Sequence, residues 1–369
     1  MKMNGWLLIY LSVFAAGAIS TLLLTPLFRA IARRTGFMDE PAANHKGHRK
    51  ATPLLGGAAI FCGWLGCLAG GAAAVALHWV PEFSRTVENH VPGMRGSGSQ
   101  LLCIVGGGLL AVLLGLWDDR RAMAAKWKFL GQFAVALIAV LGGRVRINLF
   151  IDNQLVTTAI SVFWLMLLMN SINFFDNMDG LAVGTIAIAM GFFTCFAALN
   201  RQFFVAALAA MTCGCSCGFW VYNAAPASIF MGDSGSHFLG YLAAVISARV
   251  TYFTHGGEQS KLTLLIPLFI LALPLFDTAM VVMIRTFNRK PFWIGDHNHI
   301  SHRFVRMGLS RPRAVLLVHL LALCIGLGML PVYWGKAQTA AVMVAQAFMM
   351  LLIITVLQLA LSEKPDARE

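Results

Sequence analysis

The sequence from residue 157 to 181, TTAISVFWLMLLMNSINFFDNMDGL, changes from an apolar run into a regular series of polar side chains. The apolar run is typical of a helix in the hydrocarbon core of a membrane. Asn170, Asn173, Asp176 and Asp179 then follow at a constant step of three. On a helix of 3.6 residues per turn this step turns by about −60°, so the four side chains are predicted to form one slowly winding polar stripe. Such a series rarely arises by chance, which indicates a functional role, and Gly180 is expected to end the helix or turn the chain.

The composition extends this interpretation to the full chain. Of the 369 residues, 58% are apolar and only 12% are charged, whereas a soluble domain carries about 25% charged residues. Apolar runs recur from end to end, each near the roughly 20 residues that a spanning helix needs. We therefore predict an all-α polytopic membrane protein that forms one transmembrane domain over residues 1–369. About eleven spans are expected, near residues 4–28, 54–80, 100–117, 129–142, 157–172, 181–199, 203–222, 237–253, 262–284, 314–334 and 339–361.

Basic side chains predict how the chain crosses the membrane. Lys and Arg concentrate in the loops after the first, third and ninth expected spans. These loops hold most of the 28 Lys and Arg, namely Arg29, Arg33, Arg34, Lys46, Arg49, Lys50, Arg120, Arg121, Lys126, Lys128, Arg285, Arg289, Lys290, Arg303, Arg306, Arg311 and Arg313. Because basic loops stay in the cytoplasm, the amino terminus is expected outside, the carboxyl terminus inside, and the loop 285–313 in the cytoplasm. The net charge of +12 also suits anionic lipid and phosphorylated substrates, and nothing else points to a nucleic acid.

Carboxylates gather near the predicted cytoplasmic surface, where ionisable groups are costly and usually functional. Asp118 and Asp119 end the third span, and two adjacent carboxylates are tolerable when a divalent cation or a shared proton lies between them. Their alternative role is a solvated helix end that the following arginines neutralise. Asp233 lies in FMGDSGSHFLG, where small residues let a backbone approach a phosphate and the carboxylate can hold Mg²⁺. The alternative there is an ordinary tight turn, with Asp233 or Ser236 as the helix cap. Asp277 is expected to end a helix near water.

Cationic side chains in the same loops suit phosphate groups. His297, His299, His302 and Arg303 follow one another in DHNHISHRF, and a guanidinium can bind a phosphate through two hydrogen bonds. A structural loop and a transition-metal site are the alternatives, although no Cys or HExxH spacing supports a metal. The further basic residues expected to bind substrate are His48, Lys50 and Lys126, for which plain membrane anchoring is the alternative. Carboxylates for Mg²⁺ and cations for phosphates together predict phosphoryl chemistry on a lipid.

The motifs NSINFFDNMDGLAVG, FMGDSGSHFLGY, WDD, TPLLGG and the histidine loop resemble those of the polyprenyl-phosphate N-acetylhexosamine-1-phosphate transferase superfamily, glycosyltransferase family 4. The resemblance runs from GFMDEP to the histidine loop. It implies transfer of a sugar 1-phosphate from a UDP-N-acetylhexosamine to undecaprenyl phosphate in the bacterial cytoplasmic membrane, with release of UMP. It also implies a need for Mg²⁺, with Mn²⁺ as a substitute, and a role in starting a cell-envelope polysaccharide.

By this resemblance, Asp118 and Asp119 are the paired catalytic aspartates near the lipid phosphate and the metal, and Asp233 holds Mg²⁺. Asp176 and Asp179 fall on the NxxNxxDxxDG signature as catalytic residues. Asn170 and Asn173 are their substrate-binding partners. The resemblance further implies direct attack by the lipid phosphate on the β-phosphate of the UDP-sugar, with a covalent aspartyl intermediate left open.

The histidine loop departs from the family pattern, because the MraY type has three consecutive histidines and the WecA type often has HxHH. This departure and about eleven spans favour the WecA type, with UDP-GlcNAc as the first expected donor. Phospho-MurNAc-pentapeptide transfer stays as an alternative, and a homodimer stays open. An ion- or proton-coupled transporter is the alternative of another class, which would place its carboxylates near the middle of the membrane.

Overall fold

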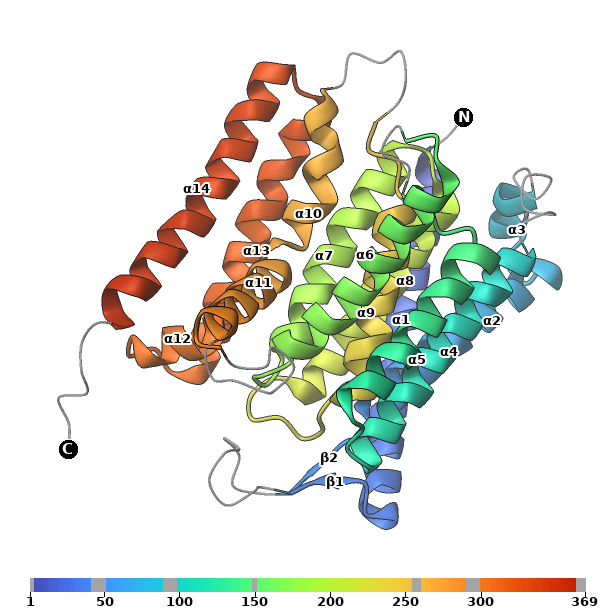
Figure 1. Cartoon of the computed structure of the whole chain (residues 1–369). Helices are drawn as coiled ribbons and strands as arrows, with labels where there is room; N and C mark the ends of the chain where they lie inside the picture. Colours follow the sequence, from blue (N-terminus) through green and yellow to red (C-terminus); the bar gives the residue numbers. More distant parts are fainter. Residues whose placement is uncertain are drawn as a thin grey trace. The chain divides into compact units, whose positions relative to one another are not determined.

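A computed structural model of the chain describes residues 3–40, 51–88, 98–147, 151–253, 260–289 and 299–362. His48, Lys50 and His297, three of the predicted site residues, lie outside the described ranges. The chain divides into two compact units, Met1–Val250 and Thr251–Glu369. Both units are built almost entirely from helices (Figure 1).

The first unit contains nine α-helices, a π-helical turn and one short hairpin within its described residues. Its elements are α1 (Met3–Thr35), β1 (Met38–Asp39), β2 (Thr52–Pro53), α2 (Gly56–Ala76), α3 (Pro81–Glu88), α4 (Gly98–Arg120), α5 (Ala125–Leu137), η2 (Ile138–Gly142), α6 (Gln154–Phe175), α7 (Leu181–Leu199), α8 (Phe203–Asn223) and α9 (Gly232–Arg249). The two strands are antiparallel, with Met38 opposite Pro53 and Asp39 opposite Thr52.

The second unit contains the 3₁₀ turn η3 (Lys261–Leu265), α10 (Ile266–Ile270), α11 (Ala272–Phe287), α12 (Ile300–Arg306), α13 (Arg311–Trp334) and α14 (Ala337–Ser362). The helices α10, α11, α12 and α14 all pack against α13. The segment of η3 and α10 meets α11 at an angle of 74°.

All eleven predicted apolar spans coincide with helical segments. Among the described residues, nine helices are long and apolar enough to cross a membrane, and the bent segment of η3, α10 and α11 would be the tenth. The chain is therefore a multi-pass helical membrane protein. The helix α9 is not among these ten. Its residues Ser234–Ser247 are buried in the unit, so it does not need a broad lipid-facing apolar surface.

The helix α9 is the centre of the first unit and packs against α2, α4 and α6 (Figure 1). Glycines on two neighbouring helices let these helices pack closely against the first turn of α9. A Cβ at Gly57 of α2 would overlap the backbone of Gly235, and a Cβ at Gly115 of α4 would overlap the backbone of Ser234. Small residues at helix contacts let backbones approach closely in membrane proteins. The approach brings the end of α4 and the start of α2 against the start of α9.

The TPLLGG motif joins the hairpin to the loop before α9. The N–H of Phe230 donates to the carbonyl of Pro53 at 2.8 Å, and the N–H of Gly57 donates to the carbonyl of Met231 at 2.9 Å. These backbone bonds hold the segment that precedes Asp233 at one end of the unit. The ends of α4, α6 and α8 and the start of α5 reach the same end (Figure 1).

Candidate active site

Asp119, in the last turn of α4, binds the first turn of α9. Its Oδ1 accepts the backbone N–H of Asp233 at 2.8 Å, and its Oδ2 accepts the backbone N–H of Ser234 at 3.1 Å. The first N–H groups of a helix have no partner within the helix, and a carboxylate is a favourable acceptor for them. Gly232 begins α9 at φ +69°, and a Cβ there would lie 2.7 Å from Asp119 Oδ2. The alternative in which Asp233 or Ser236 caps this helix is wrong, because Asp119 does so from another helix.

Lys128 lies between two of the predicted carboxylates. Its Nζ is 2.8 Å from Asp118 Oδ2 and 2.6 Å from Asp233 Oδ2. Asp118 also accepts the backbone N–H of Met123 at 2.7 Å, which holds the turn between α4 and α5. The Asp118 side chain is only 11% exposed, so its charge needs a cation close by. We call Asp118, Asp119, Lys128, Asn173, Asp176 and Asp233 the carboxylate–lysine cluster.

Asn173 joins the NxxN part of the motif to Asp233. Its Nδ2 donates to Asp233 Oδ1 at 2.7 Å and to Ser236 Oγ at 2.9 Å, and its Oδ1 lies 3.4 Å from Lys128 Nζ. Both oxygens of Asp233 therefore have partners, one from α5 and one from α6. The orientation of this carboxylate is set by side chains that are far apart in the sequence.

Asn170, one helical turn earlier, lies in a buried network behind the cluster. It exchanges two hydrogen bonds with Gln132, at 2.6 Å and 3.3 Å. Gln132 also donates to His237 Nε2 at 2.9 Å, because His237 Nδ1–H donates to the carbonyl of Asp233 at 2.7 Å. Gln132 and His237 are fully buried. This places Asn170 in a supporting role, whereas its predicted contact with substrate stays a prediction.

The second half of the polar series does not lie on the helix. The helix α6 ends at Phe175, with Asp176 as its C-cap, and Asp179 lies in the following turn. The prediction of one helical stripe is thus wrong beyond Asn173. Gly180, at φ +74°, is the N-cap residue of α7, as expected for a residue that turns the chain. Asp179 Oδ2 accepts the N–H of Ala227 at 3.0 Å and so ties this turn to the loop between α8 and α9.

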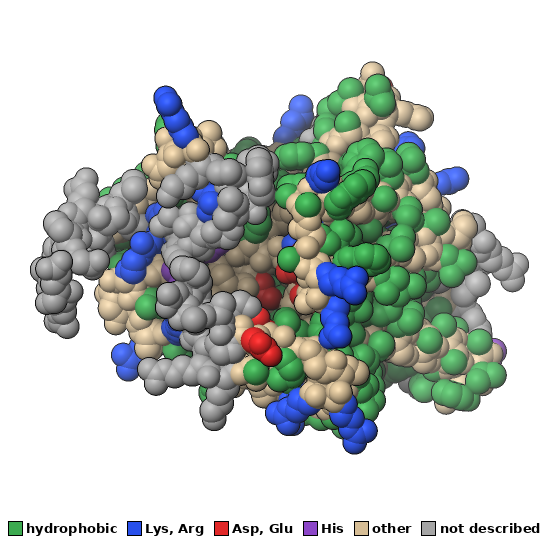
Figure 2. All heavy atoms as spheres, turned by 60° about the horizontal axis from the view of Figure 1, so that its bottom comes forward, with side chains coloured by type: hydrophobic (Ala, Val, Ile, Leu, Met, Phe, Trp, Pro, Cys, Tyr) green, Lys and Arg blue, Asp and Glu red, His purple; other side chains and the backbone are tan. Residues whose placement is uncertain are grey.

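The surroundings of Asp176 favour its protonated form. Burial, followed by the nearby carboxylates of Asp233, Asp119 and Asp179, raises the pKa of Asp176 to about 8. Both causes disfavour the charged form. A neutral carboxylic acid at pH 7 is therefore expected here. On the face drawn in Figure 2, acidic side chains gather in one small area beside a broad hydrophobic surface.

The donor set of the cluster fits a divalent cation that completes its coordination elsewhere. Mg²⁺ takes oxygen ligands and usually keeps water or substrate phosphates beside one or two carboxylates. Asp118 Oδ2 and Asp233 Oδ2, which meet at one ammonium group, are such a pair. No group of three or more His, Cys, Asp or Glu side chains within the described ranges can hold a metal by itself. Both Asp119 oxygens are already used by α9.

Three predicted residues of the histidine loop belong to the second unit. His299 Nδ1–H donates to Asp277 Oδ2 at 2.6 Å, and the ring of His302 lies 6.3 Å from that of His299 between centroids. Arg303 is buried. Sequence reasoning placed Asp277 at a helix end near water, but the structure buries it against His299.

Sequence reasoning chose Lys126 as a substrate ligand and missed Lys128. Lys126 is exposed, and its Nζ lies 5.4 Å from the ring centroid of Trp127. The missed residues Lys128 and Gln132 stand four apart on α5, so they share one face of this helix. Two long polar side chains at that spacing inside a span are a signal that could have identified them.

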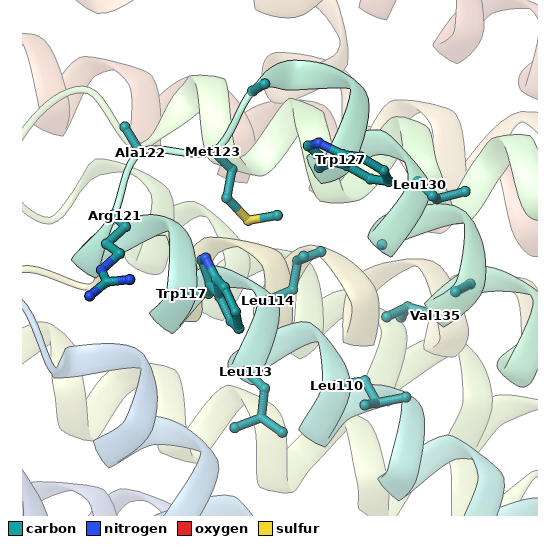
Figure 3. Close-up of a pocket in the computed structure, with 13 residues that line it drawn as sticks. Leu110, Leu113, Leu114, Trp117, Arg121, Ala122, Met123, Trp127, Leu130 and Val135 are labelled. Carbon is teal, nitrogen blue, oxygen red and sulfur yellow. The ribbon is translucent and has the colours of Figure 1, made fainter.

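A groove of about 780 Å³ lies between the helices α4 and α5, near the turn that joins them (Figure 3). Trp117 from α4 and Trp127 from α5 line it near the turn, where Met123 points between them (Figure 3). Arg121 is the charged residue among its lining side chains, and leucines form its deeper part. Trp117 and Trp127 are 64% and 55% exposed, as in an interfacial aromatic belt.

These helices and their acidic cluster match a known class of membrane enzyme. Residues 101–251, which extend from the first turn of α4 to the end of α9, match glycosyl transferase family 4. The chain is 30% identical over 320 residues to the "Probable undecaprenyl-phosphate N-acetylglucosaminyl 1-phosphate transferase" of Bacillus subtilis, covering 84% of this chain and 80% of that protein. The chain therefore belongs to glycosyl transferase family 4, which confirms the resemblance seen in the motifs.

Two further relatives show the range of the family around this chain. The "Decaprenyl-phosphate N-acetylglucosaminephosphotransferase" of Mycolicibacterium smegmatis is 28% identical over 378 residues, covering 95% of this chain and 89% of that protein. The "Phospho-N-acetylmuramoyl-pentapeptide-transferase" of Bacillus licheniformis is 27% identical over 322 residues, covering 81% of this chain and 90% of that protein.

Proposed function

We propose that this chain transfers N-acetylglucosamine 1-phosphate from UDP-GlcNAc to undecaprenyl phosphate. The products are undecaprenyl-diphosphate-GlcNAc and UMP, and the reaction starts a cell-envelope polysaccharide on the cytoplasmic side of a bacterial inner membrane. The observation that carries the proposal is the meeting of Lys128 with Asp118 and Asp233, in a chain whose relatives in Bacillus and Mycolicibacterium bear the names of such transferases.

The reaction needs positioning and charge more than covalent help from the protein. An oxygen of the lipid phosphate forms a bond to the β-phosphorus of UDP-GlcNAc. The bond from that phosphorus to the oxygen bridging the two phosphates breaks, and the electron pair leaves with UMP. Lys128 is placed to stabilise the charge on the phosphate oxygens, as a point charge with three donors. Asp176, which its pKa of about 8 leaves protonated at pH 7, suits the donation of a hydrogen bond to a phosphate oxygen.

The cation that such a reaction uses has candidate ligands in the cluster. Asp118 and Asp233 would hold Mg²⁺, with Mn²⁺ as a substitute, while Asp119 would keep α9 in place. A bound divalent ion would neutralise the charge on the phosphates during transfer. Lys128 would then neutralise the negative charge of the carboxylates that the ion does not balance.

Substrate contacts are assigned to two further groups of side chains. We assign the diphosphate and nucleotide to the histidine loop, with His297, His299, His302 and Arg303, and to His48, Lys50 and Lys126. We assign the polyprenyl chain to the groove between α4 and α5, because it is apolar and carries Arg121 near the turn. The same turn is tied to Asp118 through Met123, so a lipid phosphate at this end would lie beside the cluster. Basic pockets between helices are suited to lipid phosphates.

The test is UMP release by the purified protein with undecaprenyl phosphate, Mg²⁺ and a panel of donors. UDP-GlcNAc, UDP-GalNAc and UDP-MurNAc-pentapeptide form the panel, because a pentapeptide transferase is among the relatives. Release that needs lipid and Mg²⁺ and disappears in Asp233→Asn would support the proposal, and the fastest donor would name the sugar. A folded protein that releases no UMP from any donor would contradict it, and proton transport would be measured next.

A further inference from the structure

Asp277 of α11 is a buried carboxylate with both oxygens engaged by the start of α12. Its Oδ2 accepts His299 Nδ1–H at 2.6 Å, and its Oδ1 accepts the backbone N–H of Ile300 at 2.6 Å. Asp277 is 1% exposed and His299 is 6% exposed. All three residues belong to the second unit.

These two bonds determine which ring nitrogen of His299 is left for a ligand. An ionised carboxylate only accepts hydrogen bonds, so Nδ1 carries the hydrogen and Nε2 does not need it in the neutral ring. The backbone bond to Ile300 fixes the carboxylate, and the fixed carboxylate fixes the ring. Rotating the ring by half a turn would break the contact between Nδ1 and Asp277. In the described part of the chain, Nε2 is the nitrogen without a protein partner.

Capping α12 does not by itself explain an aspartate at this position. A single backbone N–H is satisfied equally well by the amide oxygen of Asn or the hydroxyl of Ser or Thr. A carboxylate at this depth is costly unless it is paired. Compared with Asn, Ser or Thr, Asp277 has a second acceptor oxygen and a negative charge, and both act on His299.

We propose that Asp277 is a positioning residue for the transferase reaction, which holds His299 so that Nε2 contacts a phosphate oxygen of the UDP-sugar. This inference rests on the proposed function. A hydrogen bond to a phosphate oxygen needs an Nε2–H donor, so in that contact both ring nitrogens donate, Nδ1 to Asp277 and Nε2 to the phosphate, and the Asp277 carboxylate balances the positive charge of the ring. Carboxylate partners of this kind set the orientation of histidines that bind metals or act in catalysis, and their removal typically costs 10- to 100-fold in affinity or activity.

The first variant changes the tautomer and keeps the cap. In Asp277→Asn, the amide oxygen still accepts the N–H of Ile300, and the amide NH₂ faces Nδ1 of His299. Nδ1 must then accept, so the ring carries its one hydrogen on Nε2 and has no positive charge for the phosphate. The expected result is a fall in kcat/KM for the UDP-sugar of roughly 10- to 100-fold. The KM for undecaprenyl phosphate and the melting temperature should stay near those of the native protein. Asp152→Asn, the same change at an exposed position, is the matched control.

The second variant keeps the contact and removes the reactive nitrogen. In His299→Asn, the side-chain amide takes the position of Nδ1 and donates to Asp277, but nothing replaces Nε2. This variant should retain its melting temperature and lose UMP release to at least the same extent as Asp277→Asn. In the double variant, the second change should add less than about twofold, because residues that act through one contact are not additive. The ¹⁵N shifts of the His299 ring should report Nδ1–H in the native protein and Nε2–H in Asp277→Asn.

The outcomes separate this inference from the proposed function. If the native protein releases no UMP, the proposed function fails, while the ring shifts still test the geometry. If the native protein is active and His299→Asn keeps near-native kcat/KM, the inference is overturned. Additive losses in the double variant would also overturn it, since Asp277 would then act on the fold and not through His299.

Discussion

Asp119 Oδ1 accepts the backbone N–H of Asp233 at 2.8 Å across a separation of 114 residues. A predicted catalytic aspartate thus positions the predicted metal ligand, by holding the helix turn on which that ligand stands. Loss of a helix cap typically costs about 0.5–2 kcal/mol. The role of Asp119 in the fold is therefore separable from a role in the reaction.

Asp119→Ala is expected to lower the melting temperature and to abolish UMP release, because the first turn of α9 loses both acceptors. Asp119→Asn keeps one acceptor oxygen and should lose less stability, yet it should still lose most activity because its NH₂ faces backbone donors. Thermal unfolding in detergent and UMP release measure the two effects. An Asp119→Ala protein with unchanged stability would contradict the capping role.

Lys128→Met is expected to lower UMP release by roughly 10²-fold or more, the range seen when one group that stabilises developing charge is removed. The physical reason is the loss of the cation between Asp118 and Asp233. Lys336→Met is the matched control, since it makes the same change on an exposed side chain that has no role in the proposed site. Equal losses in both variants would mean that general surface charge, and not the cluster, is responsible.

Ala134→Trp is expected to fill the groove between α4 and α5 and to raise the KM for undecaprenyl phosphate by about tenfold, which is a change of 1.4 kcal/mol. A short acceptor such as farnesyl phosphate should be affected much less, because it does not need the deeper part of the groove. The matched control is Phe133→Trp, on an exposed neighbour that does not line the groove. If Ala134→Trp keeps the native KM for undecaprenyl phosphate, the polyprenyl chain does not lie in this groove.

Asp176 is expected to make the metal-free protein less stable as the pH rises. Its pKa is about 8 in the folded protein and about 3.9 in an unfolded chain, so between these values the folded state binds the additional proton. Stability therefore falls from about pH 4 to about pH 8 and then levels off. Asp176→Asn has no proton to lose, so in EDTA its melting temperature should rise relative to the native protein across this range. Parallel pH curves for the two proteins would contradict the raised pKa.

Much of the site was predictable from local patterns. Asn173 and Asp176 were selected because an amide and a carboxylate followed an apolar run, and Asp233 because small residues surround it. The structure brings the three close together. Asp277 and Lys128 were underrated, because each looked like an ordinary helix end or membrane anchor. Their partners lie 22 and 105 residues away, at His299 and Asp233, and no local pattern predicts such pairs.

The sequence by itself determined that the chain crosses a membrane and where its helices lie, because a bilayer requires roughly 20 apolar residues per span and internal backbone bonds. It also identified the carboxylates, since such groups beside hydrocarbon are too costly to occur without a role. Only the tertiary structure decided that Lys128 pairs with Asp118 and Asp233 and that Asp119 caps α9. The capping depends on how closely α4 approaches α9, and that approach depends on the backbone contact between Gly115 and Ser234.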